Sequence, residues 1–324
     1  MELVSQMLAG NYQSLARLIT MVERDAPELP EIMRELYPHT GKTHVIGITG
    51  PPGQGKSTVV DRLTHLIRER GLSVGIIAVD PTSPFSGGAV LGDRIRMQQH
   101  YLDDEVFIRS MATRGSRGGL PTGIRSIIRV LDAFGKDFIM VETVGVGQTE
   151  LDIMQAVDTI VVVLAPESGD TVQTMKAGLM EISDIFVVNK ADRQGASYLV
   201  AELEAMLHLS EKKSWWTVPV MATEAINNVG IDELYHQIEK HHQLASQTGQ
   251  LAIRRQEQRR DELISAVEQK IVSQLTKLVA KDGQLKDYVD RVEEGKLDPY
   301  NASQEILTSR TLLKTWLKEL RNEP

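Results

Sequence analysis

The sequence predicts an α/β fold, a doubly wound and mostly parallel sheet with helical extensions at both ends. Between residues 43 and 242, short apolar runs that suit strands alternate with amphipathic helical patterns. The strand-like runs are continuous and β-branched, as in Ile160-Val161-Val162-Val163-Leu164, which is typical of strands covered on both faces. Before and after this region the apolar spacing is helical and shows no clear strand pattern.

The first part, residues 1–42, is predicted to form short amphipathic helices that pack as an extension of the core. Breaks are expected at Gly10 and at Pro27–Pro30. The apolar positions at helical spacing are Leu3, Met7, Leu15, Leu18, Ile19 and Met21.

Residues 43–242 are predicted to form the α/β core. In a doubly wound sheet, ligands bind beyond the carboxyl ends of the strands, so the residues that carry chemistry are expected there. In chain order the expected elements are the strand His44–Thr49, the helix Val59–Ile67 and the strands Leu72–Val79, Phe138–Val141, Thr159–Ala165, Ile185–Val188 and Val218–Met221.

Residues 243–324 are predicted to form a helical arm, in which the polar tract Gln250–Lys281 leads to a second helical stretch. Apolar residues with few strands to pack on favour an arm that docks on another surface, and we expect a homodimer. The alternative is a tail that folds back on its own core. The apolar positions are Tyr288, Val289, Val292, Ile306, Leu312, Leu313, Trp316 and Leu320.

The composition excludes several classes of protein. With 41% hydrophobic and 25% charged residues in 324, the chain can bury a core. A formal net charge of −8 argues against nucleic acid as the main partner. The chain has no cysteine, which excludes disulfides, thiolate zinc sites and iron–sulfur clusters. Any metal ion must therefore be held by oxygen or imidazole.

The apolar pattern gives no sign of a membrane partner. The longest strongly apolar stretch, Ile160–Ala165, is far too short to span a bilayer. No basic and then apolar leader follows Met1–Glu2. We therefore expect a cytoplasmic protein.

A phosphate-binding loop is predicted between the first strand and the first core helix. Glycines let successive backbone amides turn inward around phosphates, and the helix N-terminus adds partial positive charge. Lys56 is expected to reach the β- and γ-phosphates, the Ser57 hydroxyl to bind Mg²⁺, and Thr58 to continue the cradle. The loop Gly50-Pro51-Pro52-Gly53-Gln54-Gly55-Lys56-Ser57 matches the pattern GxxxxGKS, which predicts a P-loop NTPase.

A guanine-recognition loop is predicted at Asn189-Lys190-Ala191-Asp192, which follows an expected strand and matches the pattern NKxD. The Asp192 carboxylate can accept hydrogen bonds from guanine N1–H and the N2 amine, and adenine offers neither. Bonds to a charged group contribute about 1.5–3 kcal/mol each, so their loss excludes adenine. Asn189 is expected to tie this loop to the phosphate loop, with the Lys190 stem against the base. The two loops predict a Mg²⁺-dependent GTPase that binds GTP and GDP.

Three acidic residues, Asp80, Asp93 and Glu142, compete as ligands of the Mg²⁺ ion beside Ser57. Magnesium bound with phosphates keeps several waters and takes only one or two protein ligands. The sequence therefore leaves open which carboxylate binds the ion directly.

The segment Glu142-Thr143-Val144-Gly145 occupies the place of the DxxG element, where the Gly145 N–H would touch the γ-phosphate. Val146 rather than glutamine follows, so the usual water-positioning side chain is missing there. Gln148 either replaces it or is a polar residue at a helix start. We therefore expect slow intrinsic hydrolysis. The predicted catalytic residues are Lys56, Asp93, Glu142 and Gly145.

Two loops, Arg109–Leu120 and Pro166–Lys176, are predicted switches that border the γ-phosphate. Arg114 and Arg117 are either transition-state donors and partner contacts or solvated surface charges. The segment Ala222-Thr223-Glu224 is expected to follow a strand and to place a backbone N–H against guanine O6.

The chain resembles the MeaB type of GTPase, earlier labelled ArgK, and is similar to the human methylmalonic aciduria type A protein. Besides the two loops, the resemblance rests on the segments Val79–Pro84, Gly87–Arg94 and Glu142–Gln148, and it runs over nearly the whole chain.

The resemblance implies a homodimeric GTPase that is a chaperone of adenosylcobalamin-dependent methylmalonyl-CoA mutase, gating cofactor loading and protecting the enzyme. It places Asp170, Gln173 and Lys176 in a mobile loop tied to partner signalling. It also implies that Lys56, Ser57, Asp80, Asp93 and Glu142 form the catalytic and magnesium cluster. Ala222-Thr223 departs from the Ser-Ala pair common in GTPases.

Two other functions use the same phosphate loop. A small-molecule or protein kinase, as the ArgK label suggests, needs an acceptor pocket and usually selects ATP, whereas Asp192 predicts guanine. A metal-insertion GTPase typically carries Cys or His clusters, and this chain has no cysteine and 8 scattered histidines.

Overall fold

The computed structural model describes residues 2–80, 97–100, 102–112, 123–143, 154–166, 178–209, 215–280, 283–310, 312 and 314. The chain forms two compact units, Met1–Arg254 and Arg255–Pro324. The division into residues 1–42, 43–242 and 243–324 stays a prediction.

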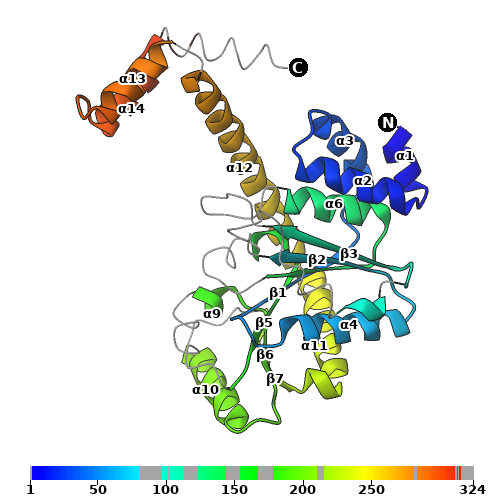
Figure 1. The fold of residues 1–324 in the computed structure, drawn as a ribbon. Helices are drawn as coiled ribbons and strands as arrows, with labels where there is room; N and C mark the ends of the chain where they lie inside the picture. Colours follow the sequence, from blue (N-terminus) through cyan, green and yellow to red (C-terminus); the bar gives the residue numbers. More distant parts are fainter. Residues whose placement is uncertain are drawn as a thin grey trace. The chain divides into compact units, whose positions relative to one another are not determined.

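The first unit is built on a parallel sheet, as predicted (Figure 1). Within the described residues it has seven strands in the order β3-β2-β4-β1-β5-β6-β7, and every neighbouring pair is parallel. All carboxyl ends therefore lie at one edge. The strands are β1 His44–Thr49, β2 Val74–Asp80, β3 Val106–Ala112, β4 Phe138–Glu142, β5 Thr159–Leu164, β6 Ile185–Asn189 and β7 Val220–Thr223.

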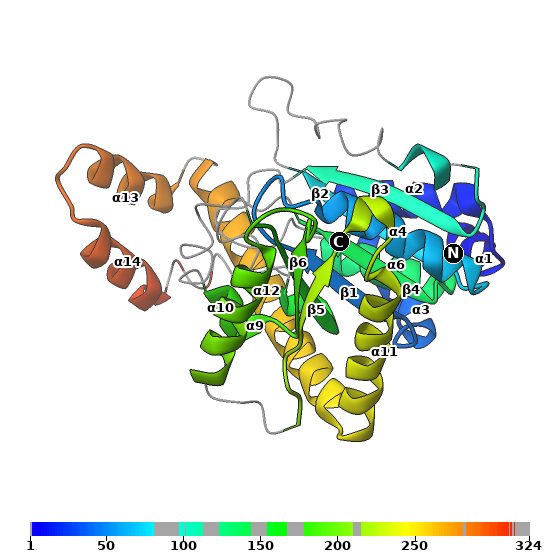
Figure 2. The ribbon, with the colours of Figure 1, turned by 90° about the horizontal axis from the view of Figure 1, so that it is seen from below.

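Helices cover both faces of the sheet. Figures 1 and 2 show α4 and α11 side by side on one face, and Figure 1 shows α6 on the other, covered in turn by α1, α2 and α3. The helices of this unit are α1 Glu2–Leu8, α2 Tyr12–Glu23, α3 Leu29–Leu36, α4 Lys56–Glu69, α6 Ile124–Phe134, α9 Met180–Ile182, α10 Ala196–Leu209 and α11 Ile231–Gln247. Single 3-10 turns are η1 Tyr37–His39, η2 Gln98–His100, η3 Met154–Ala156 and η5 Ala225–Asn227.

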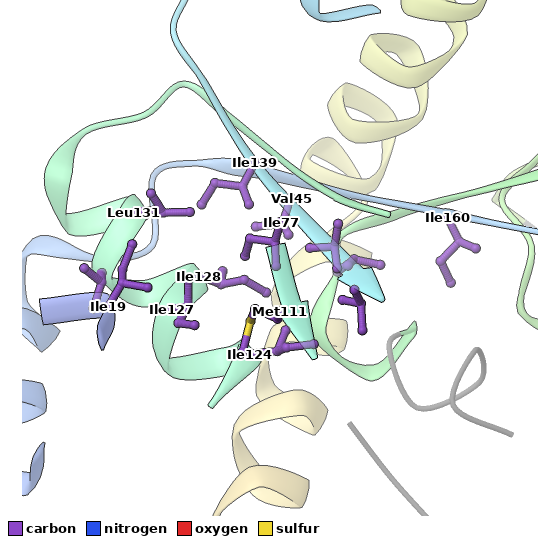
Figure 3. Packing of buried hydrophobic residues seen from close by; sticks show 14 of the residues in the cluster. Ile19, Val45, Ile77, Met111, Ile124, Ile127, Ile128, Leu131, Ile139 and Ile160 are labelled. Carbon is purple, nitrogen blue, oxygen red and sulfur yellow. The ribbon is translucent and has the colours of Figure 1, made fainter. Parts of the chain in front are cut away.

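Within the described residues, the core of the first unit consists of two apolar layers, one on each face of the sheet. Successive residues of β4 alternate between them, since Ile139 packs in the layer under α6 and Met140 in the layer under α4. A side chain of this size contributes about 1.5–3 kcal/mol when fully buried. Figure 3 shows the first layer, with Val45, Ile77, Ile139 and Ile160 from the sheet, Ile124, Ile127, Ile128 and Leu131 from α6, and Ile19 from α2.

Polar bonds fasten the N-terminal helices to the rest of the unit. Arg109 of β3 forms an ion pair with Glu23 of α2. Lys136 Nζ donates to the Tyr12 hydroxyl at 2.7 Å and to the Glu105 carbonyl at 3.0 Å. Burial lowers the pKa of Lys136, although Glu105 opposes this effect, and burial raises the pKa of Tyr12 to about 12.

Several sequence predictions about elements differ from the structure. The strand β3 was not expected, and it contains the start of the predicted loop Arg109–Leu120. The strands β2 and β7 begin two residues later than predicted, and β7 also ends two residues later. Pro30 lies in the first turn of α3 rather than in a break, because a proline there costs no helix hydrogen bond.

The second unit holds most of α12 Gln250–Ala280, with α13 Gln284–Glu293 and α14 Pro299–Thr308. The predicted helical character is confirmed for these ranges. Leu312 is buried in an apolar cluster with Leu285, beside Leu275 and Val279, so it packs within its own unit and is not exposed for a partner. Leu313, Trp316 and Leu320 lie outside the described residues.

The start of α12 is anchored to the sheet by a buried ion pair. The Asp184 carboxylate, fully buried just before β6, accepts hydrogen bonds from Arg254 Nη1 at 2.8 Å and Nη2 at 3.2 Å and from the Ile160 N–H at 3.0 Å. A pair of fork-shaped bonds to both carboxylate oxygens is a strong arrangement.

Among the described helices, none combines the length and apolar character that crossing a bilayer requires. The expected cytoplasmic location stays a prediction.

Replacing Arg254 with methionine is expected to destabilise the first unit by about 3 kcal/mol, because a buried carboxylate loses its main cationic partner. This is the lower end for such a change, since His241 Nε2 remains 3.4 Å from Asp184. Urea unfolding measures the loss. The matched control is Arg260→Met, which removes an exposed pair with Asp261 and should cost less than about 0.5 kcal/mol. Equal losses in the two variants would contradict the anchoring role.

Candidate nucleotide site

The phosphate loop lies between β1 and α4, at the carboxyl edge of the sheet. Three glycines in it have left-handed φ angles, 136° at Gly50, 79° at Gly53 and 90° at Gly55. A Cβ atom at Gly50 would collide with the carbonyl oxygen of Val163, and one at Gly55 with the side-chain amide of Asn189. All three glycines therefore suit the turn, and Gly50 and Gly55 are also needed for the close approach of the neighbouring segments.

Lys56 is buried beneath the loop at the start of α4. Its Nζ donates to the carbonyl oxygens of Gly50 at 2.6 Å and Pro51 at 2.9 Å. The Lys56 side chain thus reaches across the loop from its last part and holds its first two residues in place. Phosphate oxygens are stronger acceptors for an ammonium group than peptide carbonyls are, so Lys56 is placed to exchange partners when a phosphate binds.

Ser57 and Glu142 meet beside the loop. Ser57 Oγ donates a hydrogen bond of 2.6 Å to Glu142 Oε1, and both side chains are buried. Glu142 is the last residue of β4, whose position next to β1 puts the carboxylate against the first turn of α4. The structure therefore brings together two of the predicted magnesium ligands, a hydroxyl and a carboxylate. Oxygen donors of this kind suit a hard divalent cation.

The other predicted magnesium and catalytic residues are less fully described. Asp80 is the last residue of β2, which pairs directly with β4, so its backbone lies at the same edge of the sheet as Glu142. Asp93 and Gly145 lie outside the described residues, as do Gln148, Arg114, Arg117, Asp170, Gln173 and Lys176.

Asn189, the last residue of β6, joins three segments through one buried side chain. Its Nδ2 donates to the Gln54 carbonyl at 2.9 Å, and its Oδ1 accepts from Thr223 Oγ1 and from the Ala225 N–H, both at 3.1 Å. The bond to Gln54 is the tie to the phosphate loop that the sequence predicted. The bonds to Thr223 and Ala225 connect the same amide to the last residue of β7 and to the start of η5.

The rest of the guanine loop leaves the sheet in a strained turn. Lys190 has a φ of 58°, uncommon for a residue with a side chain. The Ala191 N–H donates to the Thr223 carbonyl at 3.0 Å, which fixes the turn to β7. Asp192 is exposed. A solvent-facing carboxylate at the end of a fixed turn is available to accept hydrogen bonds from a guanine base.

The prediction for Ala222-Thr223-Glu224 needs correction. Ala222 and Thr223 are the last two residues of β7 and do not lie in a loop after it. Thr223 is fully buried and supports Asn189 instead of facing a base. The Glu224 N–H donates to the Val229 carbonyl at 3.0 Å, so it is already used within the chain. The contact to guanine O6 therefore has no support from this segment.

A polar contact between Thr143 and Thr49 at the site was not predicted from the sequence. Thr143 Oγ1 donates to Thr49 Oγ1 at 2.9 Å, and the Thr143 N–H bonds to the Ile48 carbonyl at 3.0 Å. These bonds hold the chain after Glu142 against the end of β1. The only available signal was that Thr49 directly precedes the phosphate loop.

The all-parallel sheet, the lysine and serine at the start of α4 and the asparagine-linked base loop define a P-loop GTPase. The family model described as "Methylmalonyl Co-A mutase-associated GTPase MeaB" matches residues 15–280. The chain belongs to this MeaB family. It is therefore a GTPase that binds GTP and GDP, as the sequence predicted.

Comparisons with individual proteins agree with this assignment. A putative GTPase of Pyrococcus abyssi is 49% identical over 94% of this chain and 95% of its own length. The methylmalonic aciduria type A homolog of Caenorhabditis elegans, described as mitochondrial, is 30% identical over 94% of this chain and 82% of its own. A crystal structure of a protein named "LAO/AO transport system kinase" has a TM-score of 0.71 and 27% identity, with 94% of this chain and 95% of that one covered.

Replacing Asp192 with asparagine is expected to weaken GTP binding by at least about tenfold, or roughly 1.4 kcal/mol. The new amide would favour xanthosine triphosphate, whose position-2 oxygen can accept a hydrogen bond. Titration with both nucleotides measures the change. The neighbouring exposed Gln194→Ala should leave both affinities unaltered, and a smaller or unselective effect at Asp192 would refute its role in base recognition.

Proposed function

We propose that this GTPase is a chaperone of adenosylcobalamin-dependent methylmalonyl-CoA mutase, which uses GTP to gate cofactor loading and to protect the enzyme. The description of the family, which names an association with the mutase, supports this proposal. The name of the Caenorhabditis elegans relative, which refers to methylmalonic aciduria, supports it too.

One structural observation favours a nucleotide-gated role. Lys56, which is expected to reach the phosphates, bonds to the Gly50 and Pro51 carbonyls, and Ser57, which is expected to hold the Mg²⁺ ion, bonds to the Glu142 carboxylate. Binding of a nucleotide exchanges these bonds. The exchanged bonds involve Gly50 and Pro51, which follow β1, and Glu142, which ends β4. Nucleotide binding therefore changes the bonding at the carboxyl ends of these two strands.

The site also fits a Mg²⁺ ion. The Ser57 hydroxyl and the Glu142 carboxylate, in contact at 2.6 Å, are oxygen donors at the start of the phosphate-loop helix. Ser57 would hold the ion, with Glu142, Asp80 or Asp93 as the carboxylate that binds it directly or through water. When bound, Mg²⁺ would neutralise charge that develops on the β- and γ-phosphate oxygens.

The residues of the chain account for the remaining steps. Backbone amides of the glycine-containing loop and the N-terminus of α4 orient the phosphates. Lys56 stabilises negative charge on the transferred group, and Asp192 selects guanine. A kinase, as the similar crystallised protein is named, would need a second substrate beside the γ-phosphate. The guanine loop and the family favour GTP hydrolysis over that alternative.

The dependence on a partner gives the test of this proposal. Val146 stands where many GTPases place a glutamine, so unaided single-turnover hydrolysis is expected to be slow. Purified methylmalonyl-CoA mutase should accelerate it, by no more than the roughly 10³–10⁵ that an arginine finger supplies. Lys56→Ala should abolish hydrolysis with and without the mutase. A fast unaided rate, or no response to saturating mutase, would rule out partner-gated hydrolysis.

We further propose a homodimer, and α12 offers a face for it. Leu263, Ile264 and Val267 are 65%, 50% and 50% exposed, and Ile271 follows one turn later. Ile264, Val267 and Ile271 recur at the three- and four-residue spacing of a helix–helix seam. A second copy of this helix has the matching apolar stripe.

Changing Val267 to glutamate is expected to convert the dimer to a monomer, because each copy would bring a buried charge to the seam. Small-angle scattering measures the oligomeric state. Gln269→Glu adds the same charge on the opposite side of α12 and should leave the dimer intact. A dimer that survives the Val267 change would place the interface elsewhere.

A further inference from the structure

A buried hydrogen-bonded pair joins the phosphate-loop helix α4 to η2 and belongs to neither sequence motif. Asp61 of α4 accepts hydrogen bonds on Oδ1 from His100 Nε2 at 3.1 Å and from Gln99 Nε2 at 2.7 Å. The side chains of His100 and Asp61 are only 5% and 11% exposed. Because an ionised carboxylate only accepts hydrogen bonds, Nε2 of His100 carries the hydrogen.

The pair lies one helical turn from the phosphate-binding residues. Asp61 follows Ser57 by four positions, so the two side chains lie on the same side of α4. His100 belongs to η2, the first described element after β2. The pair therefore connects η2 to the first turns of the phosphate-loop helix.

An ion pair joins the same two segments farther from the site. Arg68 of α4 donates to Asp103 at 2.8 Å and to the Leu72 carbonyl at 2.8 Å. Asp61 and Arg68 are seven residues apart, or about two turns. The η2 segment, here residues 97–100 with 102 and 103, is thus tied to α4 at two places, by His100 to Asp61 and by Asp103 to Arg68. If this segment served only to stabilise the fold, loss of the His100 bond and loss of the Asp103 bond would have the same effect on hydrolysis.

The charge state of Asp61 is consistent with a strong bond to His100 and Gln99. Burial alone would raise the pKa of Asp61, but the hydrogen bonds from His100 and Gln99 outweigh burial and keep the pKa below its ordinary value. The carboxylate is therefore charged at neutral pH. A buried charged acceptor with two donors fixes geometry more strictly than an apolar contact of the same size.

We propose that Asp61 and His100 are positioning residues for GTP hydrolysis, which hold the first turns of α4 against the η2 segment so that Lys56 and Ser57 meet the phosphates in the reactive geometry. The inference rests on the GTPase activity of the family and not on the association with the mutase. It assigns a function in hydrolysis to a pair that belongs to neither the phosphate loop nor the guanine loop.

The strand order separates this role from nucleotide affinity. The guanine loop follows β6, on one side of β1, whereas β2 lies on the other side and η2 comes between β2 and β3 in the chain. Loss of the Asp61 tie should therefore affect the phosphate end and leave recognition of the base unchanged. The expected result is a lower kcat with little change in affinity for a fluorescent GDP analogue.

Asp61→Asn tests this inference with little change in shape. We expect kcat for unaided GTP hydrolysis to fall about tenfold or more, because displacements near 1 Å in a catalytic site cost up to roughly a hundredfold. KM and GDP affinity should stay within about twofold. The matched control is Asp103→Asn, which weakens the distal tie on the same segment. It should lower the melting temperature to a similar extent and leave kcat within about twofold.

A second pair of variants covers the case in which Asp61→Asn does not fold. His100→Leu removes the donor to Asp61 and should reproduce the loss of kcat, and His100→Gln restores an N–H donor and should recover part of it. Unchanged kcat in folded Asp61→Asn or His100→Leu protein would overturn the proposal. An equal loss of kcat in Asp103→Asn would also overturn it, since only general destabilisation would then be involved.

Discussion

The nucleotide site depends on one buried amide. Asn189 donates to the phosphate loop and accepts from two groups at the end of β7, so a single side chain sets the distance between the phosphate end and the base end of the site. All three bonds are buried, where an unmade bond costs about 1–3 kcal/mol. The close packing at Gly55 follows from this, because a Cβ there would occupy the space of the Asn189 amide. The Asn189 amide, Gly55 and the turn at Lys190 therefore act together to fix the distance between the phosphate end and the base end of the site.

The sheet supplies the partners that this constraint needs. Because β1 lies between β4 and β5, the phosphate loop leaves the centre of the sheet with Glu142 on one side and the backbone of Val163 on the other. The parallel direction of all strands brings residues that are distant in sequence to one edge. The opposite edge carries stability: His44 Nε2 and His241 Nδ1 both contact Thr159 Oγ1, at 2.8 and 2.9 Å, and Asp184 anchors Arg254.

The sequence predicted the parts of this arrangement that have strong local patterns. The core strands are apolar on both faces, so six of the strands in Figure 1 could be found, and the glycine and asparagine loops have fixed spacing. Strand β3 lacks such a pattern: it lies at the edge of the sheet, and Arg109 within it bonds to a helix from the N-terminal part, a contact between distant residues. The burial of Thr223 and Leu312 likewise depends on tertiary packing that spacing does not encode.

The internal bonds of the phosphate loop explain how it keeps a binding geometry of its own. A loop with three left-handed glycines has high conformational entropy when unrestrained, and ordering it during binding would reduce affinity. Here the Lys56 ammonium restrains the loop from below, Asn189 from the side, and Glu142 restrains Ser57. Phosphate and cation need to replace only the bonds of Lys56 and Ser57, while Asn189 keeps all of its own. The loop is therefore preorganised by two kinds of hydrogen bond. The bonds of Asn189 persist when the nucleotide binds, whereas the bonds of Lys56 and Ser57 are exchanged. Only the exchanged bonds differ between the free and the nucleotide-bound protein, so only they can transmit the presence of the nucleotide to β1 and β4.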